Sequence, residues 1–199
     1  RGDKIYINTA GIGFLKYPGL SPKNIKKGDK VIVSGTVGDH GTAVMLSRIG
    51  MEQEGIRSDC AALNGLCEAI LSTGGGVRVL RDPTRGGAAT TLNEFVEGTP
   101  LGIELDERLI PVRPDVQAAC DMLGLDAMYC ANEGKLLAVV APEAEERVLE
   151  AMHRTDEGKD AVTIGEVTDG YPGRLVMNTA FGGRRILQKL TGAQLPRIC

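Results

Sequence analysis

The sequence is poor in the features that nucleic-acid-binding and membrane proteins need. Of its 199 residues none is tryptophan and only 4% are aromatic, so a row of rings that could stack on bases is absent. The longest apolar run is 136–141, whereas a membrane-spanning helix needs about 20 residues. The formal net charge is -3, and Lys and Arg are scattered singly, so no basic stripe forms. We therefore expect neither nucleic acid nor membrane as a partner.

The sequence lacks a pairing pattern among its cysteines. The five cysteines are an odd number without a CxxC pair, which fits neither a disulfide framework nor a zinc site. We expect a reducing, cytoplasmic compartment and no metal site. Four cysteines fall in apolar periodic segments, where we expect them to act as small buried hydrophobic residues. These four are Cys60, Cys67, Cys120 and Cys130, and the fifth is the last residue, Cys199.

Strand-like and helix-like segments alternate along most of the chain. Glycine is abundant, at 27 of 199 residues, against an average of about 7%, so many turns are expected. The pattern predicts an α/β or α+β domain with a mixed sheet flanked by helices. Expected strands are a short one within 26–35 that ends at Gly35, and 77–80, 101–105, 135–141, 161–167, 174–177 and 184–187. Expected helices are 40–50, 59–73 with Asp59 as N-cap, 88–97, 114–123 and 142–153.

The two ends of the chain differ from this body. The chain starts at Arg1 and at once enters a strand-like segment, 3–9, so we expect 1–26 to be the remnant of another domain and its linker. The body is then 27–187. Residues 188–199 contain the helix breakers Gly192 and Pro196, and we expect a mobile tail there.

The loop between the strand 77–80 and the helix 88–97 is a candidate anion site. Two glycines at a helix start expose backbone N–H groups that suit a phosphate. Arg85 could add a bidentate contact, Thr84 a hydroxyl, and Asp82 could orient a donor or bind Mg²⁺. Gly86 and Gly87 supply the tight turn. The alternative is an ordinary strand-to-helix turn with a capping side chain.

A second turn of this kind is 35–41, with Asp39 and His40 at a helix start. The helix dipole there favours a neutral imidazole that could donate to developing negative charge. The alternative is a capping Asp beside a partly exposed His.

The segment 132–135 comes directly before the most apolar strand. A carboxylate such as Glu133 at the edge of a dry core can become a general base. The alternative is a turn in which Glu133 and Lys135 are merely solvated.

A cysteine at the end of a mobile segment could reach more than one site. The 12 residues from Gln188 to Cys199 span up to about 40 Å if extended. Its position does not match a prenylation signal. A terminal cysteine can also occur by chance.

Together these motifs resemble a known family. The segments DKIYINTAGIG, GTVGDHG, SDCAALNGL, RDPTRGG, IPVRPDV, CANEGK and LPRIC are similar to those of the HypE family of nickel-iron hydrogenase maturation proteins, in the PurM-like superfamily of aminoimidazole ribonucleotide synthetase. The resemblance runs along the whole chain. It implies a PurM C-terminal-like domain at 27–187, and an N-terminal ATP-binding domain of which only 1–26 would remain, so that this piece alone would be folded yet inactive.

The resemblance also implies an activity. The carbamoyltransferase HypF would load a carbamoyl group onto Cys199, and ATP with Mg²⁺ would be used to dehydrate it to a thiocyanate. The cyanide would pass to a HypC–HypD complex, and the full-length protein would be a homodimer. By resemblance Cys199 is the carrier, Glu133 the base, and Lys4 or His40 the stabilising charge.

The same resemblance assigns the phosphate side of the cleft to the loop 82–87 and to Asn132. Two other functions stay open. One is another PurM-like reaction, of the selenophosphate synthetase or thiamine-monophosphate kinase type. The other is a docking module without catalysis.

Overall fold

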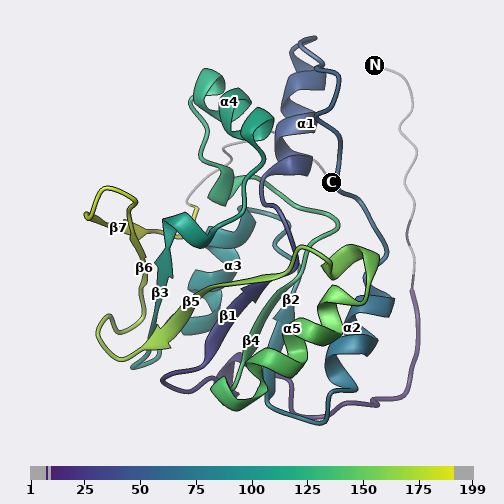
Figure 1. Ribbon diagram of the computed structural model, residues 1–199, viewed down its shortest axis with the longest axis vertical. Helices are drawn as coiled ribbons and strands as arrows, with labels where there is room; N and C mark the ends of the chain where they lie inside the picture. Colours follow the sequence, from purple (N-terminus) through teal and green to yellow (C-terminus); the bar gives the residue numbers. More distant parts are fainter. Residues whose placement is uncertain (1–7, 9, 191–199) are drawn as a thin grey trace.

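The computed structural model describes residues 8 and 10–190, and they form one mixed sheet with helices on both faces (Figure 1). The strand order is β2-β4-β1-β5-β3-β6-β7, and every neighbouring pair is antiparallel except β3 and β6. The mixed α/β sheet expected from the sequence is therefore confirmed. The strands are β1 Lys30–Val33, β2 Val77–Arg81, β3 Gly102–Asp106, β4 Leu137–Val140, β5 Val162–Thr168, β6 Leu175–Asn178 and β7 Arg184–Leu187.

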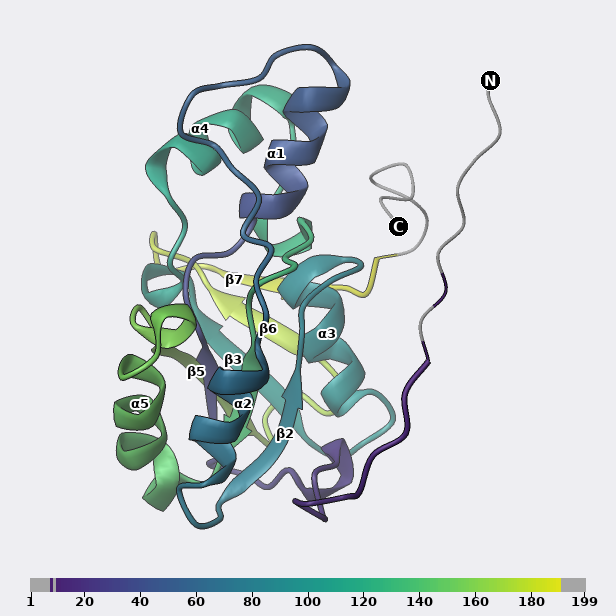
Figure 2. The ribbon, with the colours of Figure 1, turned by 90° about the vertical axis from the view of Figure 1, so that its right-hand side faces the viewer.

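The helices divide into three groups. Helices α2 and α5 cover one face of the sheet, α3 covers the other, and α1 and α4 pack together beyond one end of the strands (Figures 1 and 2). None of the helices in the described part of the chain is long and apolar enough to cross a membrane. Their bounds are α1 Asp39–Arg48, α2 Asn64–Leu71, α3 Gly87–Val96, α4 Pro114–Leu123 and α5 Glu145–His153.

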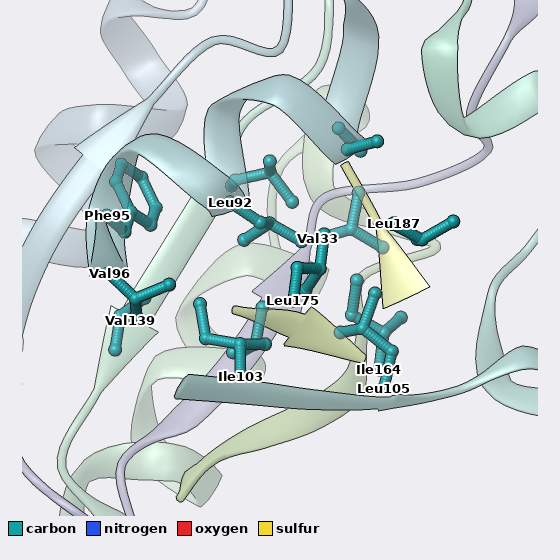
Figure 3. Packing of buried hydrophobic residues seen from close by; sticks show 14 of the residues in the cluster. Val33, Leu92, Phe95, Val96, Ile103, Leu105, Val139, Ile164, Leu175 and Leu187 are labelled. Carbon is teal, nitrogen blue, oxygen red and sulfur yellow. The ribbon is translucent and has the colours of Figure 1, made fainter. Parts of the chain in front are cut away.

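Strand β1 shows why helices cover both faces of the sheet. Its side chains alternate: Val31 and Val33 pack with the α3 face, whereas Ile32 packs with α2 and α5. All three are fully buried, as expected of a central strand. Figure 3 shows Val33 among Leu92 and other apolar side chains of the α3 face. Burying each such side chain contributes about 1.5–3 kcal/mol to the free energy of folding. Because neighbouring residues of β1 point to opposite faces, the sheet takes part in both hydrophobic cores.

Two predicted helix starts were wrong. Helix α2 begins at Asn64, five residues after the expected N-cap Asp59. The Asp59 carboxylate instead accepts the backbone N–H of Glu133 at 3.0 Å, a long-range contact that a local capping pattern cannot reveal. The expected helix 142–153 begins as a separate 3₁₀ turn, Pro142–Ala144, before α5.

The cysteines are buried less uniformly than expected. Cys120 and Cys130 are buried and Cys67 is half-buried, but Cys60 is exposed. The prediction was wrong for Cys60 because residues 58–63 are not the first turns of a helix with an apolar face. They have no regular secondary structure, and Cys60 is exposed there.

The packed residues extend beyond both ends of the body that the sequence predicted, 27–187. The N–H of Ser21 donates to Arg78 O at 2.8 Å and Ile25 is buried, so the packed body includes residues 21–25. Residues 188–190, expected to open a mobile tail, lie against α3. The Tyr129 hydroxyl donates to Gln188 O at 2.9 Å, and the N–H of Leu190 donates to Thr90 Oγ1 at 3.3 Å. The strand-like segment 3–9 and residues 191–199 lie outside the described residues, apart from Asn8.

Candidate functional site

The polar turns selected from the sequence meet at one end of the sheet. Strand β4 is antiparallel to both β1 and β2, and Leu137 lies opposite Val33 and Arg81. The residues before β4 must therefore lie beside those that follow β1 and β2. This topology brings 130–136, 34–41 and 82–87 together.

Asn132 joins the three segments. Its side chain is 0% exposed, with Oδ1 accepting the Gly38 N–H at 2.8 Å. Its Nδ2 donates to Cys130 O at 3.1 Å and to Pro83 O at 3.4 Å. Both amide groups are thus occupied by the protein, so in this structure Asn132 positions the turns. A direct contact of Asn132 with a nucleotide stays a prediction.

The loop 82–87 enters α3 through two glycines in the left-handed conformation. Gly86 has φ 74° and Gly87 φ 62°. A Cβ on Gly87 would lie 2.5 Å from Met128 O and 2.6 Å from Cys130 O, so the loop is pressed against the 128–130 backbone. The side chain of Arg85 is exposed and makes no hydrogen bond or ion pair with the described residues. The first N–H groups of a helix also lack intrahelical partners. These features suit the loop to an anion, and phosphate binding by the loop stays a prediction.

Asp39 and His40 at the start of α1 have different roles. The Asp39 carboxylate is buried, accepts the Thr36 hydroxyl at 2.7 Å and lies 3.8 Å from Arg113 Nη1, so Asp39 holds the turn. His40 Nδ1 lies 2.8 Å from Ser58 Oγ. Ser58 Oγ also accepts the Cys60 N–H at 3.2 Å. The other ring nitrogen, His40 Nε2, is buried without a partner among the described residues.

Glu133 combines a fixed backbone with a free side chain. Its N–H donates to Asp59 Oδ1 at 3.0 Å, while its half-buried carboxylate makes no hydrogen bond or ion pair to any residue that the structure describes. The Lys135 side chain packs along Gly35, with Cε 3.4 Å from the position of a Cβ there. Glu133 is thus available to a ligand.

Two cysteines lie beneath these turns. Thr42 Oγ1 is 3.3 Å from Cys120 Sγ. The pKa of Cys120 is lowered to about 7, chiefly because Cys130 donates a hydrogen bond to it. The pKa of Cys130 is raised by that same bond and then by burial. Both thiols pack between α1 and α4, as the sequence predicted for them.

The remaining predicted site residues make few contacts with these turns or lie outside the described residues. Asp82 is exposed, 3.8 Å from Arg81, and Thr84 O accepts the Gly87 N–H at 3.0 Å. Lys4 and Cys199 lie outside the described residues. Sequence reasoning missed the role of Ser58 and Asp59, which resembled a helix start. The described residues contain no group of three or more His, Cys, Asp or Glu that could hold a metal ion.

Comparison with protein families and curated proteins gives consistent matches. Residues 26–178 match the family described as AIR synthase related protein, C-terminal domain. The chain is 48% identical over 203 residues to carbamoyl dehydratase HypE of Bradyrhizobium diazoefficiens, and 46% identical over 202 residues to that of Azotobacter vinelandii. Each match covers 100% of this chain, but only 58% and 59% of the relative. The chain therefore spans less than two thirds of the relatives' length.

Solved structures give the same result. A crystal structure of hydrogenase maturation protein HypE matches with a TM-score of 0.87 and 40% identity, covering 93% of this chain and 60% of that one. A HypE–HypF complex matches with 0.80 and 44%, covering 86% and 57%. A HypE structure in complex with ATP matches with 0.84 and 39%, covering 90% and 55%. Thiamine monophosphate kinase from Aquifex aeolicus, at 17% identity and a TM-score of 0.52 over 80% of this chain and 53% of that one, shares the fold alone.

Proposed function

We propose an activity for this chain on the premise that it belongs to the AIR synthase related family and, within that family, to the HypE proteins. The activity is the ATP-dependent dehydration of a carbamoyl group on the Cys199 sulfur to a thiocyanate, which supplies a cyanide ligand for a nickel-iron hydrogenase. Curated relatives named carbamoyl dehydratase support this proposal.

The carrying observation is the free carboxylate of Glu133 on a fixed backbone. A general base must be accessible to the proton that it removes and held in one place. Glu133 meets both requirements, since its N–H is bound by Asp59 and its carboxylate has no partner among the described residues. The anion-suited loop 82–87 joins the same cluster of turns through Asn132.

The chemistry requires two steps that these groups can assist. The carbamoyl oxygen is a poor leaving group, and transfer of the ATP γ-phosphoryl group to it, with release of ADP, turns it into a phosphate ester. One N–H proton is lost when the phosphorylated group forms its C=N bond, and removal of the second N–H proton lets the C–O bond break, so that phosphate leaves and the C≡N bond forms. We assign the proton removal to Glu133. We assign the contacts with phosphate oxygens to Arg85 and the start of α3, and a hydrogen bond to the substrate oxygen to His40 Nε2.

ATP fits the described residues in part. The exposed, unpartnered Arg85 and the N-terminus of α3 suit phosphates, and a HypE structure has been solved in complex with ATP. We propose that this chain lines the phosphate side of such a site. Mg²⁺ would accompany ATP as a charge neutraliser, with Asp82 as the candidate ligand in this chain.

The partners are proposals of the same kind. The HypE–HypF complex supports HypF as the protein that loads Cys199. Delivery to a HypC–HypD complex, homodimer formation and a cytoplasmic location follow from the family resemblance.

The test uses a protein of the relatives' length that contains this chain. It is incubated with HypF, carbamoyl phosphate and ATP, and the peptide ending in Cys199 is examined by mass spectrometry. We expect the mass of one added carbamoyl group, followed by loss of one water. Glu133→Gln should accumulate the carbamoyl form, because the second step then lacks its base.

Cys199→Ser is the matched control and should remain unmodified. A carbamoyl or cyano group found on another residue of Cys199→Ser would exclude the carrier role of Cys199. An unmodified Cys199 in a stable complex with HypF would favour the docking module instead.

A further inference from the structure

We propose that Asp59 is a positioning residue for the reaction: its carboxylate fixes the backbone of Glu133 and so aims the base at the substrate. This inference rests on the proposed function, and it concerns a residue for which the sequence suggested only a helix cap.

The first observation is the contact itself. Asp59 Oδ1 accepts the Glu133 N–H at 3.0 Å, across 74 residues of sequence. A carboxylate acceptor makes this a charge-assisted bond, which is stronger than a bond between neutral groups. It holds the main chain at the residue whose side chain is free. A rigid backbone with a free carboxylate is what accurate proton removal needs.

The second observation is the tight fit of the next residue. A Cβ on Gly134 would overlap Asp59 O and lie 2.9 Å from the Ala61 N. The backbones of 59–61 and 133–134 are therefore in direct contact. Asp59 is fastened to the Glu133 turn by its side chain and by its main chain.

The third observation is that the segment containing Asp59 also contacts helix α1, through Ser58 and His40. Ser58 Oγ accepts the Cys60 N–H at 3.2 Å and lies 2.8 Å from His40 Nδ1. His40 belongs to α1, whose Gly41 N–H donates to Ala131 O at 2.9 Å. The contacts form a closed circuit from α1 through Ser58 and Asp59 to Glu133, and back through Ala131.

The fourth observation is that Asp59 is a poor choice for stability alone. Its second oxygen, Oδ2, is buried without a partner among the described residues, which costs free energy. A residue that keeps an unsatisfied carboxylate oxygen while bonding the backbone of Glu133 is better explained by the position that it gives to Glu133.

The test separates geometry from charge. Asp59→Asn keeps an oxygen in place and removes the charge, whereas Asp59→Glu keeps the charge and moves the oxygen by one methylene. Both are made in a protein of the relatives' length and loaded with carbamoyl groups by HypF. The single-turnover rate of thiocyanate formation and the dissociation constant for ATP are then measured. We expect Asp59→Glu to slow the reaction by about 10- to 100-fold. Asp59→Asn should stay within about threefold of the wild type, and ATP affinity should be unchanged in both.

A double-mutant cycle with Glu133→Gln tests whether Asp59 acts through Glu133. If it does, Asp59→Glu causes no further loss once Glu133 is replaced. Equal losses in both backgrounds would mean a general structural effect and would overturn the inference, as would a normal rate in Asp59→Glu. If Glu133→Gln alone turns over normally, the base assignment in the proposed function has failed as well.

Discussion

At the scale of single residues, the turns of the candidate site are held together by hydrogen bonds from polar side chains. Asn132 accepts one N–H and donates to two carbonyl groups, each on a different turn. Asp39 and Asp59 serve neighbouring turns in a similar way. The side chains of Glu133 and Arg85, by contrast, make no hydrogen bond or ion pair with the described residues.

Replacing Asn132 should therefore weaken the protein more than its size suggests. Asn132→Ala leaves the buried Gly38 N–H without its partner and removes the donor to Cys130 O and Pro83 O. Each unsatisfied buried group costs about 1–3 kcal/mol, so we expect the free energy of unfolding in urea to fall by about 2–4 kcal/mol. Asn64→Ala, at an exposed position, is the control and should change it by less than about 0.5 kcal/mol. Equal effects of the two changes would contradict the supporting role.

At the scale of elements, the turns are fixed by glycines that leave no room for a side chain. Gly134 touches Asp59 O, and Gly87 touches the 128–130 backbone. Gly65 has open space around it, although it lies in α2.

These two kinds of glycine should respond oppositely to a methyl group. Gly134→Ala forces the 59–61 and 133–134 backbones apart, so we expect a loss of stability of about 1–3 kcal/mol. Gly65→Ala should raise stability by up to about 1 kcal/mol, because alanine favours the helix. Thermal unfolding followed by circular dichroism distinguishes the two results. A neutral Gly134→Ala would mean that the two segments separate easily.

The elements also show how far the sequence could be read. Short apolar or alternating runs were sufficient to find β1 to β7, and two glycines marked the loop between β2 and α3, because these signals are local in the sequence. The start of α2 could not be found, since Ser58-Asp59 has the composition of a cap and its real partner is Glu133. Likewise Asn132 was selected for its place in a motif, while its burial depends on three segments that meet only through the strand order. For the candidate site, the sequence therefore indicated which turns carry polar groups, whereas the contacts of Asn132 and Asp59 that hold these turns together could not be read from it.

At the scale of the whole molecule, one sheet supports two cores. Strands β1 and β4 send side chains to both faces, so the packing of α3 on one side and of α2 and α5 on the other depends on the same strands. We expect the domain to unfold as one unit.

Cavities made on opposite faces should therefore affect the same transition. Leu92→Ala in α3 and Ile70→Ala in α2 each empty a fully buried position, and each should cost about 2–5 kcal/mol. Far-ultraviolet circular dichroism and tyrosine fluorescence should report the same urea midpoint in both variants. Leu109→Ala, at a position that is 47% exposed, is the matched control. Two separate transitions would show that the faces unfold independently.

The contacts of Gln188 and Leu190 with Tyr129 and Thr90 set the radius within which the terminal sulfur can operate. Nine residues follow Leu190, so whatever path they take, Cys199 stays within about 30 Å of the first turn of α3. Confinement to that volume gives the thiol an effective concentration on the order of millimolar at the loop 82–87. A group carried on that sulfur would meet the loop as an intramolecular reactant, without dilution into the surrounding solution.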